Sequence, residues 1–310
     1  MWAGVFASPL GGKKDSRLLF GVMSSLKVYL DSANWFDLAE GKASKENFEL
    51  GVKMGLVVPV LSFVHVLEFG NREEPYRSHA TAYIDSINAI NPILWIRGLP
   101  AVVKAEVENI LLSSMGVSPV SVNPFVEHLV DSLEASIPWL ERAEARTYSI
   151  SKIVQESAST DSRSRYQNFR TSSPMFNIQS LRELKQKHSH CPLVPDVPEY
   201  AADYLGKKVT TPSGLTIEVT PESKECFKRN FSLSACPAFS SKLTFFEGWS
   251  LSSGGEAPSM FEDLFHLVAL AYCDVVFVDG QTREALKKGK MLKLPLAHRD
   301  FKGWLEKLPM

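Results

Sequence analysis

The sequence predicts an α/β fold with a mainly parallel central sheet, and the spacing of its apolar runs leads to this expectation. Short strand-forming runs, KVYL (27–30) and VVPVL (57–61), alternate with longer stretches that carry helical signals. The same alternation returns near the end of the chain, where a helical stretch precedes VVFV (275–278). Alternating strands and helices are typical of a parallel sheet covered by helices. Between 146 and 258 the alternation is absent, which predicts a large mid-chain insertion.

The first elements follow one another closely. KVYL ends on Asp31, and the residues after it have the character of a loop that enters a helix. After the second strand, the stretch 62–71 is expected to be a helix with Ser62 as its N-cap. Glu68 lies nearly two turns into that helix. The run ILWI (93–96) is the third expected strand.

Two helices are expected after the third strand. The stretch 100–116 has proline at its entry and glycine at its exit, which is a good helix signature. The stretch 123–145 begins with Asn123 as N-cap and Pro124 at the first helical position. Pro138 should kink or split this second helix, because proline lacks the backbone N–H that a helix interior needs.

The α/β pattern is clearest near the C-terminus. The stretch 260–272 has apolar residues at helical spacing, 275–278 is a fully apolar strand, and 282–289 is a short helix with lysines in its last turn. Within the insertion, 207–219 predicts a hairpin that turns at Pro-Ser-Gly, and 252–259 has the composition of a linker.

The domain organisation follows from these breaks in pattern. A chain of 310 residues is long enough for one large domain with an insertion or for two domains. We expect one α/β domain formed by 24–149 and 259–310. Residues 150–258 are expected to be an insertion or a helical cap, and 1–23 a lead that precedes the fold.

Composition excludes several classes of protein. The formal net charge is −1, so no global basic field indicates nucleic-acid binding, although a local patch is compatible with that charge. The four cysteines have no CxxC spacing, which argues against a structural zinc site and a disulfide framework and favours reduced thiols in a cytoplasm. No apolar run approaches the roughly 18 residues of a membrane helix.

Acidic residues stand where expected parallel strands end. Asp31 follows KVYL and Asp279 follows VVFV, and sites in parallel sheets form at the carboxyl ends of strands. Glu68 and Asp263 lie on helices next to strands of the same core. A cluster of carboxylates repels itself unless a divalent cation supplies positive charge, and oxygen ligands suit Mg²⁺ or Mn²⁺. Such a cluster is suited to phosphodiester hydrolysis.

The stretches KVYLDSANW, PVLSFVHVLEFGNR and FEDLFHLVALAYCDVVFVDG together resemble the PIN-domain nucleases. The resemblance covers about 24–100 and 259–300. It implies a three-layer α/β/α PIN-like fold and a metal-dependent endoribonuclease that uses Mg²⁺ or Mn²⁺ and acts on RNA. It further implies that four residues are both catalytic and metal-binding: Asp31, Glu68, Asp263 and Asp279.

Each of these carboxylates also has a purely structural interpretation. Asp31 and Asp279 can cap the helices that follow them, and Glu68 can be a solvated helix residue. Asp263 can serve the first turn of its helix, where acids are favoured by the dipole. Asn34 can support the site through a hydrogen bond or only begin a helix.

Two other functions stay open for the chain as a whole. One is a catalytically degenerate PIN-like module that binds nucleic acid or protein without cleaving it. The other is a phosphohydrolase of the haloacid dehalogenase kind, which is disfavoured because Ala33 stands where that family's second aspartate belongs.

A basic stretch in the middle of the chain predicts contacts with nucleic acid. Residues 142–187 contain nine basic and four acidic side chains, interspersed with aromatic residues. Such a surface can bind a phosphate backbone and stack unpaired bases, so we expect Arg163, Arg165 and Arg170 to contact single-stranded RNA. The alternative is a solvated helical face. A protein inhibitor is left open as a second partner.

Overall fold

The structure is a computed structural model that describes residues 25–133, 143–158, 196–211, 213–250, 260–289 and 301–307. Within those ranges, the side chains of 249–250, 260–265 and 281 are outside the description. The expected lead at 1–23, the linker at 252–259 and the three arginines at 163, 165 and 170 therefore lie outside the described residues.

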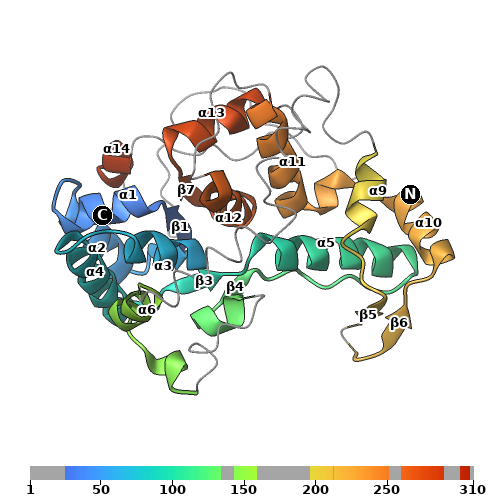
Figure 1. The fold of residues 1–310 in the computed structure, drawn as a ribbon, viewed down its shortest axis with the longest axis horizontal. Helices are drawn as coiled ribbons and strands as arrows, with labels where there is room; N and C mark the ends of the chain where they lie inside the picture. Colours follow the sequence, from blue (N-terminus) through green and yellow to red (C-terminus); the bar gives the residue numbers. More distant parts are fainter. Residues whose placement is uncertain are drawn as a thin grey trace, which may run out of the picture.

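The chain alternates strands and helices in its first third and again near its end (Figure 1). The elements up to residue 158 are β1 (Leu26–Leu30), α1 (Ser32–Ala39), α2 (Lys45–Lys53), β2 (Val57–Leu61), α3 (Phe63–Gly70), α4 (Tyr76–Ile90), β3 (Leu94–Ile96), α5 (Leu99–Ser114), β4 (Phe125–Val126), the 3₁₀ turns η1 (Leu129–Ser132) and η2 (Ala143–Thr147), and α6 (Ile150–Ser157). The later elements are α9 (Val197–Ala202), β5 (Lys208–Thr210), β6 (Thr216–Glu218), α10 (Pro221–Asn230), η4 (Leu233–Ala235), α11 (Pro237–Ser250), α12 (Met260–Tyr272), β7 (Val275–Phe277), α13 (Gly280–Lys288) and α14 (Phe301–Leu305).

The central sheet has five strands in the order β4-β3-β2-β1-β7. Strands β1, β2, β3 and β7 are parallel, and the short strand β4 pairs antiparallel with β3 at one edge. In the β1–β7 pair, Leu30 lies opposite Phe277. The expected fold class, α/β with a mainly parallel sheet, is confirmed. The separate hairpin of β5 and β6 is also found where its turn signal predicted it.

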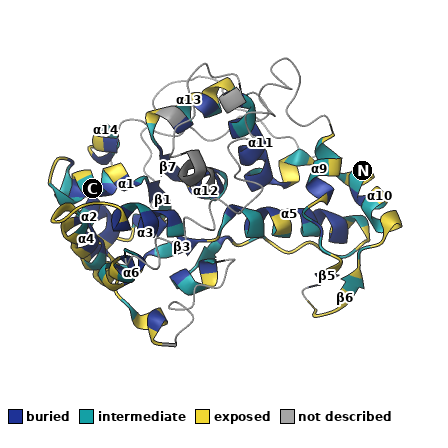
Figure 2. Ribbon diagram, in the orientation of Figure 1, coloured by how far each residue is buried: buried dark blue, intermediate teal, exposed yellow. Residues whose placement is uncertain are grey.

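Side chains alternate between the two faces of the sheet, as the pleat of a strand requires. Tyr29 and Val60 belong to one buried cluster with residues of α5, α11 and α12. Leu30 and Leu61 belong to a second cluster with residues of α1, α2, α4 and α6. The strands are largely buried, whereas α2 and α4 present exposed outer faces (Figure 2). Helices on both faces are compatible with a three-layer α/β/α arrangement.

The prediction of a helix over 123–145 is wrong for its first residues. Asn123 does accept a hydrogen bond from the N–H of Phe125, at 3.1 Å, as a cap residue would. The chain then runs extended instead, because Phe125 and Val126 pair with the open edge of β3. Pairing with a strand far away in the sequence therefore overrides a local helix signal.

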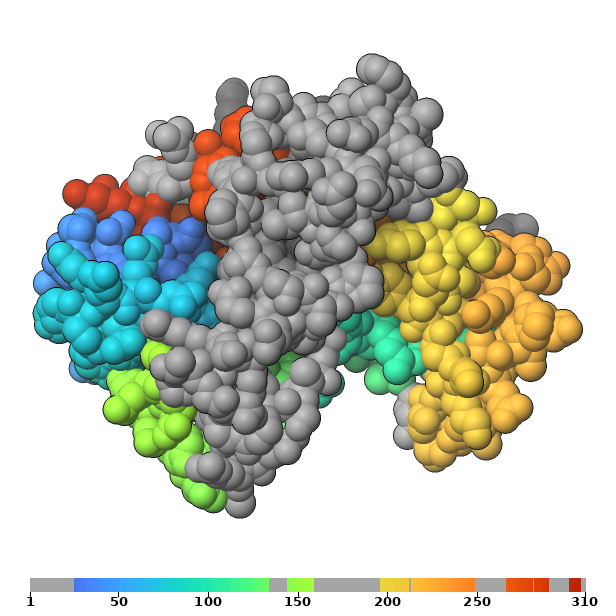
Figure 3. All heavy atoms as spheres, in the orientation of Figure 1, coloured from blue at the N-terminus to red at the C-terminus, as the bar shows by residue number. Residues whose placement is uncertain are grey.

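The described part of 150–258 packs on both halves of the α/β core. Helix α6 contacts α3 and α4, while α11 contacts α5, α12 and α13. Residues of α9, α10 and α11 share one hydrophobic cluster with α5 and α12. In the space-filling view, residues near 200–245 lie at one end of the molecule and the first strands and helices at the other (Figure 3).

Helices α11 and α13 cross at two glycines. A Cβ atom at Gly248 would overlap the carbonyl oxygen of Ala285, and one at Gly289 would overlap the carbonyl oxygen of Thr244. The backbones of the two segments therefore approach more closely than any larger residue permits. Since α13 begins directly after Asp279, this contact also holds the helix that Asp279 precedes.

We expect Gly248→Ala to lower the free energy of unfolding by about 1–3 kcal/mol, because the new methyl group meets backbone and not a flexible side chain. Gly280→Ala, in the first turn of α13, is the matched control, since nothing lies within 4 Å of its added Cβ. Denaturant unfolding of both variants measures the effect. Equal stability of the two variants would contradict the close approach.

A buried carboxylate connects helices α5, α11 and α12 on the face of the sheet that these helices cover. Glu106 of α5 is 1% exposed. It accepts hydrogen bonds from the N–H groups of Ala238 and Phe239, at 2.7 and 3.1 Å, and from the hydroxyl of Tyr272, at 2.7 Å. The two N–H groups belong to the first turn of α11, so Glu106 caps that helix from a distance. Burial raises the pKa of Glu106 to about 7, against the opposite effect of its three donors.

Glu106→Gln is expected to destabilise the fold at about pH 5 by roughly 1–3 kcal/mol. The amide N–H₂ of the new glutamine would face a backbone N–H, and two donors cannot bond each other. Since the pKa of Glu106 is raised, its stabilising contribution is present below its ordinary value of 4.5 and is lost as the pH rises through about 7. The difference in unfolding free energy between wild type and variant should therefore shrink between about pH 5 and about pH 8. The exposed Glu73→Gln is the control. A difference that grows with pH would refute this assignment.

Candidate functional site

Two of the expected site residues meet where β1 and β7 end. Asp31 follows β1, and its N–H donates to the carbonyl of Phe277 at 3.0 Å. Asp279 stands two residues beyond Phe277 at the end of the neighbouring parallel strand. Both aspartates therefore lie at the carboxyl edge of the sheet, as their positions after apolar strands predicted.

Both carboxylates cap the helices that follow them. The Asp31 Oδ1 accepts from the N–H of Ala33 at 2.6 Å and from that of Asn34 at 3.4 Å. The Asp279 Oδ1 accepts from the N–H of Thr282 at 2.6 Å. The structural interpretation of these residues as N-caps is thus correct. It is compatible with metal binding, because all these bonds are made by Oδ1 and a carboxylate has a second oxygen. For Asn34, the described contacts are those of its backbone N–H, which lies in the first turn of α1 and donates to Asp31.

The environment of Asp31 disfavours its negative charge. Burial raises the pKa of Asp31, and the negative charges of Asp279 and Asp37 raise it further, against the lowering effect of the two helix N–H groups. A positive charge placed near such an acid stabilises its ionised form. The edge formed by Asp31 and Asp279 is therefore suited to a cation.

Glu68 reaches the same region from α3. The hydroxyl of Ser32, the residue after Asp31, donates to the Glu68 Oε2. The Nε2 of His266 lies 4.0 Å from the Glu68 Oε1, and the Glu68 side chain is 28% exposed. Glu68 thus lies beside the segment that carries Asp31, and both of its oxygens face polar groups from other elements.

A buried polar network lies beneath these acids. The Tyr29 hydroxyl contacts the Ser62 Oγ at 2.8 Å and the Nδ1 of His266. The Nδ1 of His65 accepts from the Ser62 N–H at 3.0 Å, and its Nε2 lies 2.6 Å from the carbonyl of Leu30. Since Nδ1 accepts, the proton of the His65 ring lies on Nε2 and is donated to Leu30.

The two histidines of this network are neutral over the ordinary pH range. Burial lowers the pKa of His65 to about 4. Burial and the neighbouring His65 lower the pKa of His266 to about 3. Sequence reasoning did not assign Tyr29 or Ser62 to the site. The tyrosine hydroxyl in the apolar run VYL of β1 is the signal that could have pointed to such a network.

The remaining expected residues are placed only in part. Asp263 lies in the first turns of α12, one turn before His266, and its side chain is outside the described part of the chain. The same holds for Arg163, Arg165 and Arg170, which are in an undescribed range. Among the side chains that are described, no three His, Cys, Asp or Glu residues are grouped to hold a metal ion. The four-acid cluster therefore stays a prediction.

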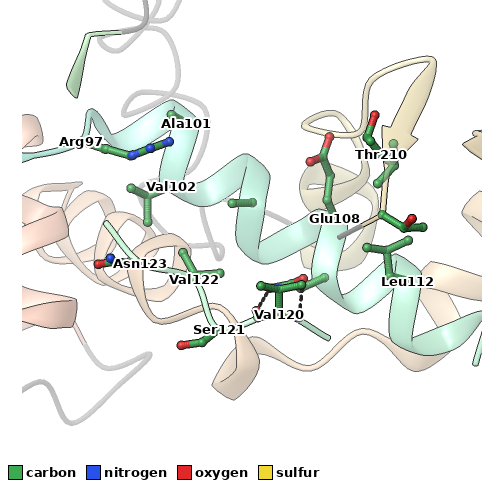
Figure 4. Close-up of a pocket in the computed structure, with 14 residues that line it drawn as sticks. Arg97, Ala101, Val102, Glu108, Leu112, Val120, Ser121, Val122, Asn123 and Thr210 are labelled. Carbon is green, nitrogen blue, oxygen red and sulfur yellow. Dashed lines mark hydrogen bonds between the residues drawn. The ribbon is translucent and has the colours of Figure 1, made fainter. Parts of the chain in front are cut away.

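A pocket of about 310 Å³ runs along α5, and none of the site acids is among its described lining residues (Figure 4). Arg97, which follows β3, lies at one end of it near Asn123, and Glu108 and Thr210 lie toward the other end. The extended segment 117–124 forms one wall and is fastened to α5 by Asn109, which bonds both the N–H and the carbonyl of Val120. The lining of the pocket carries one basic and one acidic side chain, so the charge of the pocket does not indicate which class of ligand it would bind.

None of the helices in the described ranges combines the length and the apolar character that a membrane crossing requires. Comparison with known proteins gives no match: no family model fits the chain, and no curated protein or solved structure resembles it significantly. The PIN-like fold and the nuclease activity that the sequence motifs imply therefore stay predictions.

We expect Asp31→Asn to leave the free energy of unfolding unchanged or slightly higher when metal is removed with a chelator. Asparagine caps helices as well as aspartate does, and the change removes the repulsion from Asp279. Asp31→Ala should instead lose about 1 kcal/mol, because the cap is lost. Asp196→Asn, at the N-cap of α9, is the matched control and should be neutral. An Asp31→Asn variant as unstable as Asp31→Ala would show that the charge is needed for folding.

Proposed function

We propose that this protein is a metal-dependent nuclease that hydrolyses phosphodiester bonds in RNA, with Asp31, Glu68, Asp263 and Asp279 as the residues that hold Mg²⁺ or Mn²⁺. The observation that carries the proposal is the pair of carboxylates at adjoining strand ends, where burial and mutual repulsion raise the pKa of Asp31. RNA is preferred over DNA on the resemblance to PIN-domain nucleases alone.

The described residues fit a hard cation in their chemistry. Asp31, Asp279 and Glu68 offer carboxylate oxygens, the ligand type that Mg²⁺ and Mn²⁺ prefer. The caps of α1 and α13 fix the two aspartates, and Ser32 orients Glu68. Asp263 is assigned from the resemblance and from its place on α12.

When bound, a divalent cation would activate water and stabilise negative charge on the phosphodiester. The contribution of the protein is to hold the acids in fixed orientations at an edge that is open to substrate. The Glu68 side chain is partly exposed, at 28%. Tyr29 and His266 contact each other next to Glu68, and both are buried.

A non-catalytic PIN-like module is the second candidate, and one observation favours it. The described bonds of Asp31 and Asp279 are all made to helix N–H groups, which is a sufficient structural reason for both residues. Activity measurements separate the two candidates, because only the nuclease needs the charges of these acids.

Wild-type protein should cleave a generic single-stranded RNA in the presence of Mn²⁺ or Mg²⁺ and not after chelation. Asp31→Asn and Asp279→Asn should each lower the rate roughly 100-fold or more, since a bound metal contributes several kcal/mol to transition-state stabilisation. The measurement is single-turnover cleavage of labelled RNA, with single-stranded DNA assayed in parallel.

Asp274→Asn is the control for these variants. Asp274 stands at the opposite end of β7, where its carboxylate accepts from the N–H of Lys27 at 2.8 Å, so its loss should leave cleavage unchanged. A wild type that cleaves no RNA with either metal would favour the non-catalytic module. A fully active Asp31→Asn variant would remove Asp31 from the site.

A further inference from the structure

The two buried histidines beside the candidate site differ in how their ring nitrogens are bonded. Both nitrogens of His65 have a hydrogen-bond partner: Nε2 lies 2.6 Å from a backbone carbonyl of β1, and Nδ1 accepts from the N–H of Ser62 at 3.0 Å. The Nδ1 of His266 bonds the hydroxyl of Tyr29. In the described part of the chain, the polar contact of its Nε2 is the Glu68 Oε1 at 4.0 Å, which is longer than a hydrogen bond. His65 is therefore a structural histidine, whereas His266 has a second nitrogen that the described hydrogen bonds do not use.

The protons of this network are placed by counting donors. A carbonyl only accepts, so His65 donates from Nε2 and has a lone pair on Nδ1. The Ser62 hydroxyl, 3.1 Å from that lone pair, therefore donates to it and accepts from the Tyr29 hydroxyl at 2.8 Å. Tyr29 has no second proton, so its oxygen accepts from the Nδ1–H of His266. A neutral imidazole has one N–H, and the Nε2 of His266 therefore carries a lone pair.

The His266 ring is fixed in its orientation by its surroundings. It is 4% exposed, and it packs edge-on against the rings of Tyr29 and His65, at centroid distances of 5.4 and 5.9 Å. The hydrogen bond from Nδ1 to Tyr29 holds the ring further. A histidine that binds a metal through one nitrogen commonly donates the N–H of the other in this way, which fixes the tautomer and raises the basicity of the ligand.

The Nε2 of His266 lies next to a carboxylate. The Glu68 Oε1 is 4.0 Å from Nε2, and the Glu68 Oε2 accepts from the hydroxyl of Ser32. A lone pair and a negatively charged oxygen repel each other, and a cation between them turns that repulsion into attraction. One cation can bond both atoms across 4.0 Å, because each such bond is about 2.1 Å long. Helices α12 and α3 thus bring a nitrogen and an oxygen to the spacing of two metal ligands.

We propose that the Nε2 of His266 is a ligand of the cation at the candidate site, and that this nitrogen makes the site favour Mn²⁺ over Mg²⁺. The inference rests on the proposed metal site, to which it adds a fifth ligand. Mg²⁺ is bound through oxygen, whereas transition-metal ions also accept imidazole nitrogen. A neutral ligand also adds no further repulsion to a group of carboxylates.

Metal titration tests the ligand role, with Mn²⁺ alone or Mg²⁺ alone as the probe. Wild type should bind Mn²⁺ more tightly than Mg²⁺. His266→Phe keeps an aromatic ring but has no lone pair, and it should bind Mn²⁺ at least about 10- to 100-fold more weakly, which is the loss that even an outer partner of a ligand causes. Its affinity for Mg²⁺ should fall less. His79→Phe, the same change at an exposed histidine of α4, is the matched control and should bind both metals as wild type does.

Pulsed EPR of bound Mn²⁺ tests the contact itself. In protein with isotopically labelled histidine nitrogens, the Mn²⁺ signal should show coupling to nitrogen in wild type and in His79→Phe, and no coupling in His266→Phe. NMR of the ring nitrogens in metal-free protein should show the His266 proton on Nδ1. A His266 proton on Nε2, or a wild-type Mn²⁺ signal without nitrogen coupling, would overturn the proposal.

The outcomes separate this inference from the metal site on which it rests. If folded His266→Phe binds Mn²⁺ as tightly as wild type, His266 is not a ligand and the site of carboxylates stands. If wild type binds neither metal and cleaves no RNA, the metal site fails and the inference fails with it. Circular dichroism checks that each variant is folded. The wild-type EPR and NMR measurements need no variant, so they decide the question where His266→Phe does not fold.

Discussion

The pairing of β1 with β7 is the contact on which the candidate site depends. It joins the first strand to one that is about 250 residues later in the chain, and hydrogen bonds fix it at both ends. Lys27 and Asp274 exchange two such bonds at one end, and the N–H of Asp31 reaches Phe277 at the other. A slip of one residue would turn every side chain of β1 to the opposite face. The register therefore determines that Asp31 and Asp279 share one edge.

The same two aspartates serve the fold and suit a cation. As N-caps they satisfy helix N–H groups that would otherwise lack partners. Their proximity and burial make the charge of Asp31 unfavourable, which is the condition under which a cation binds with most gain. A cap also restricts the rotation of its side chain, so the structural role and the proposed role support each other.

Helix α12 links the candidate site to the middle of the chain. Near its end, Tyr272 donates to Glu106, which in turn caps α11. Farther toward its start, His266 contacts Tyr29 on the sheet. The close crossing of α11 with α13, at Gly248, holds the helix that follows Asp279. The described elements near 200–250 thus support both helices next to the acids, although this part of the chain showed no α/β pattern.

The sequence by itself determined the local elements: apolar runs became the strands that end on Asp31 and Asp279, and cap residues marked where their helices begin. These features depend on residues a few positions apart in the sequence, so the sequence alone is enough to predict them. Only the tertiary structure decided that Phe125 joins the sheet edge, that Glu106 caps a distant helix, and that His266 faces Glu68. Such contacts join residues far apart in the sequence, and the free energy of packing selects them over local preference.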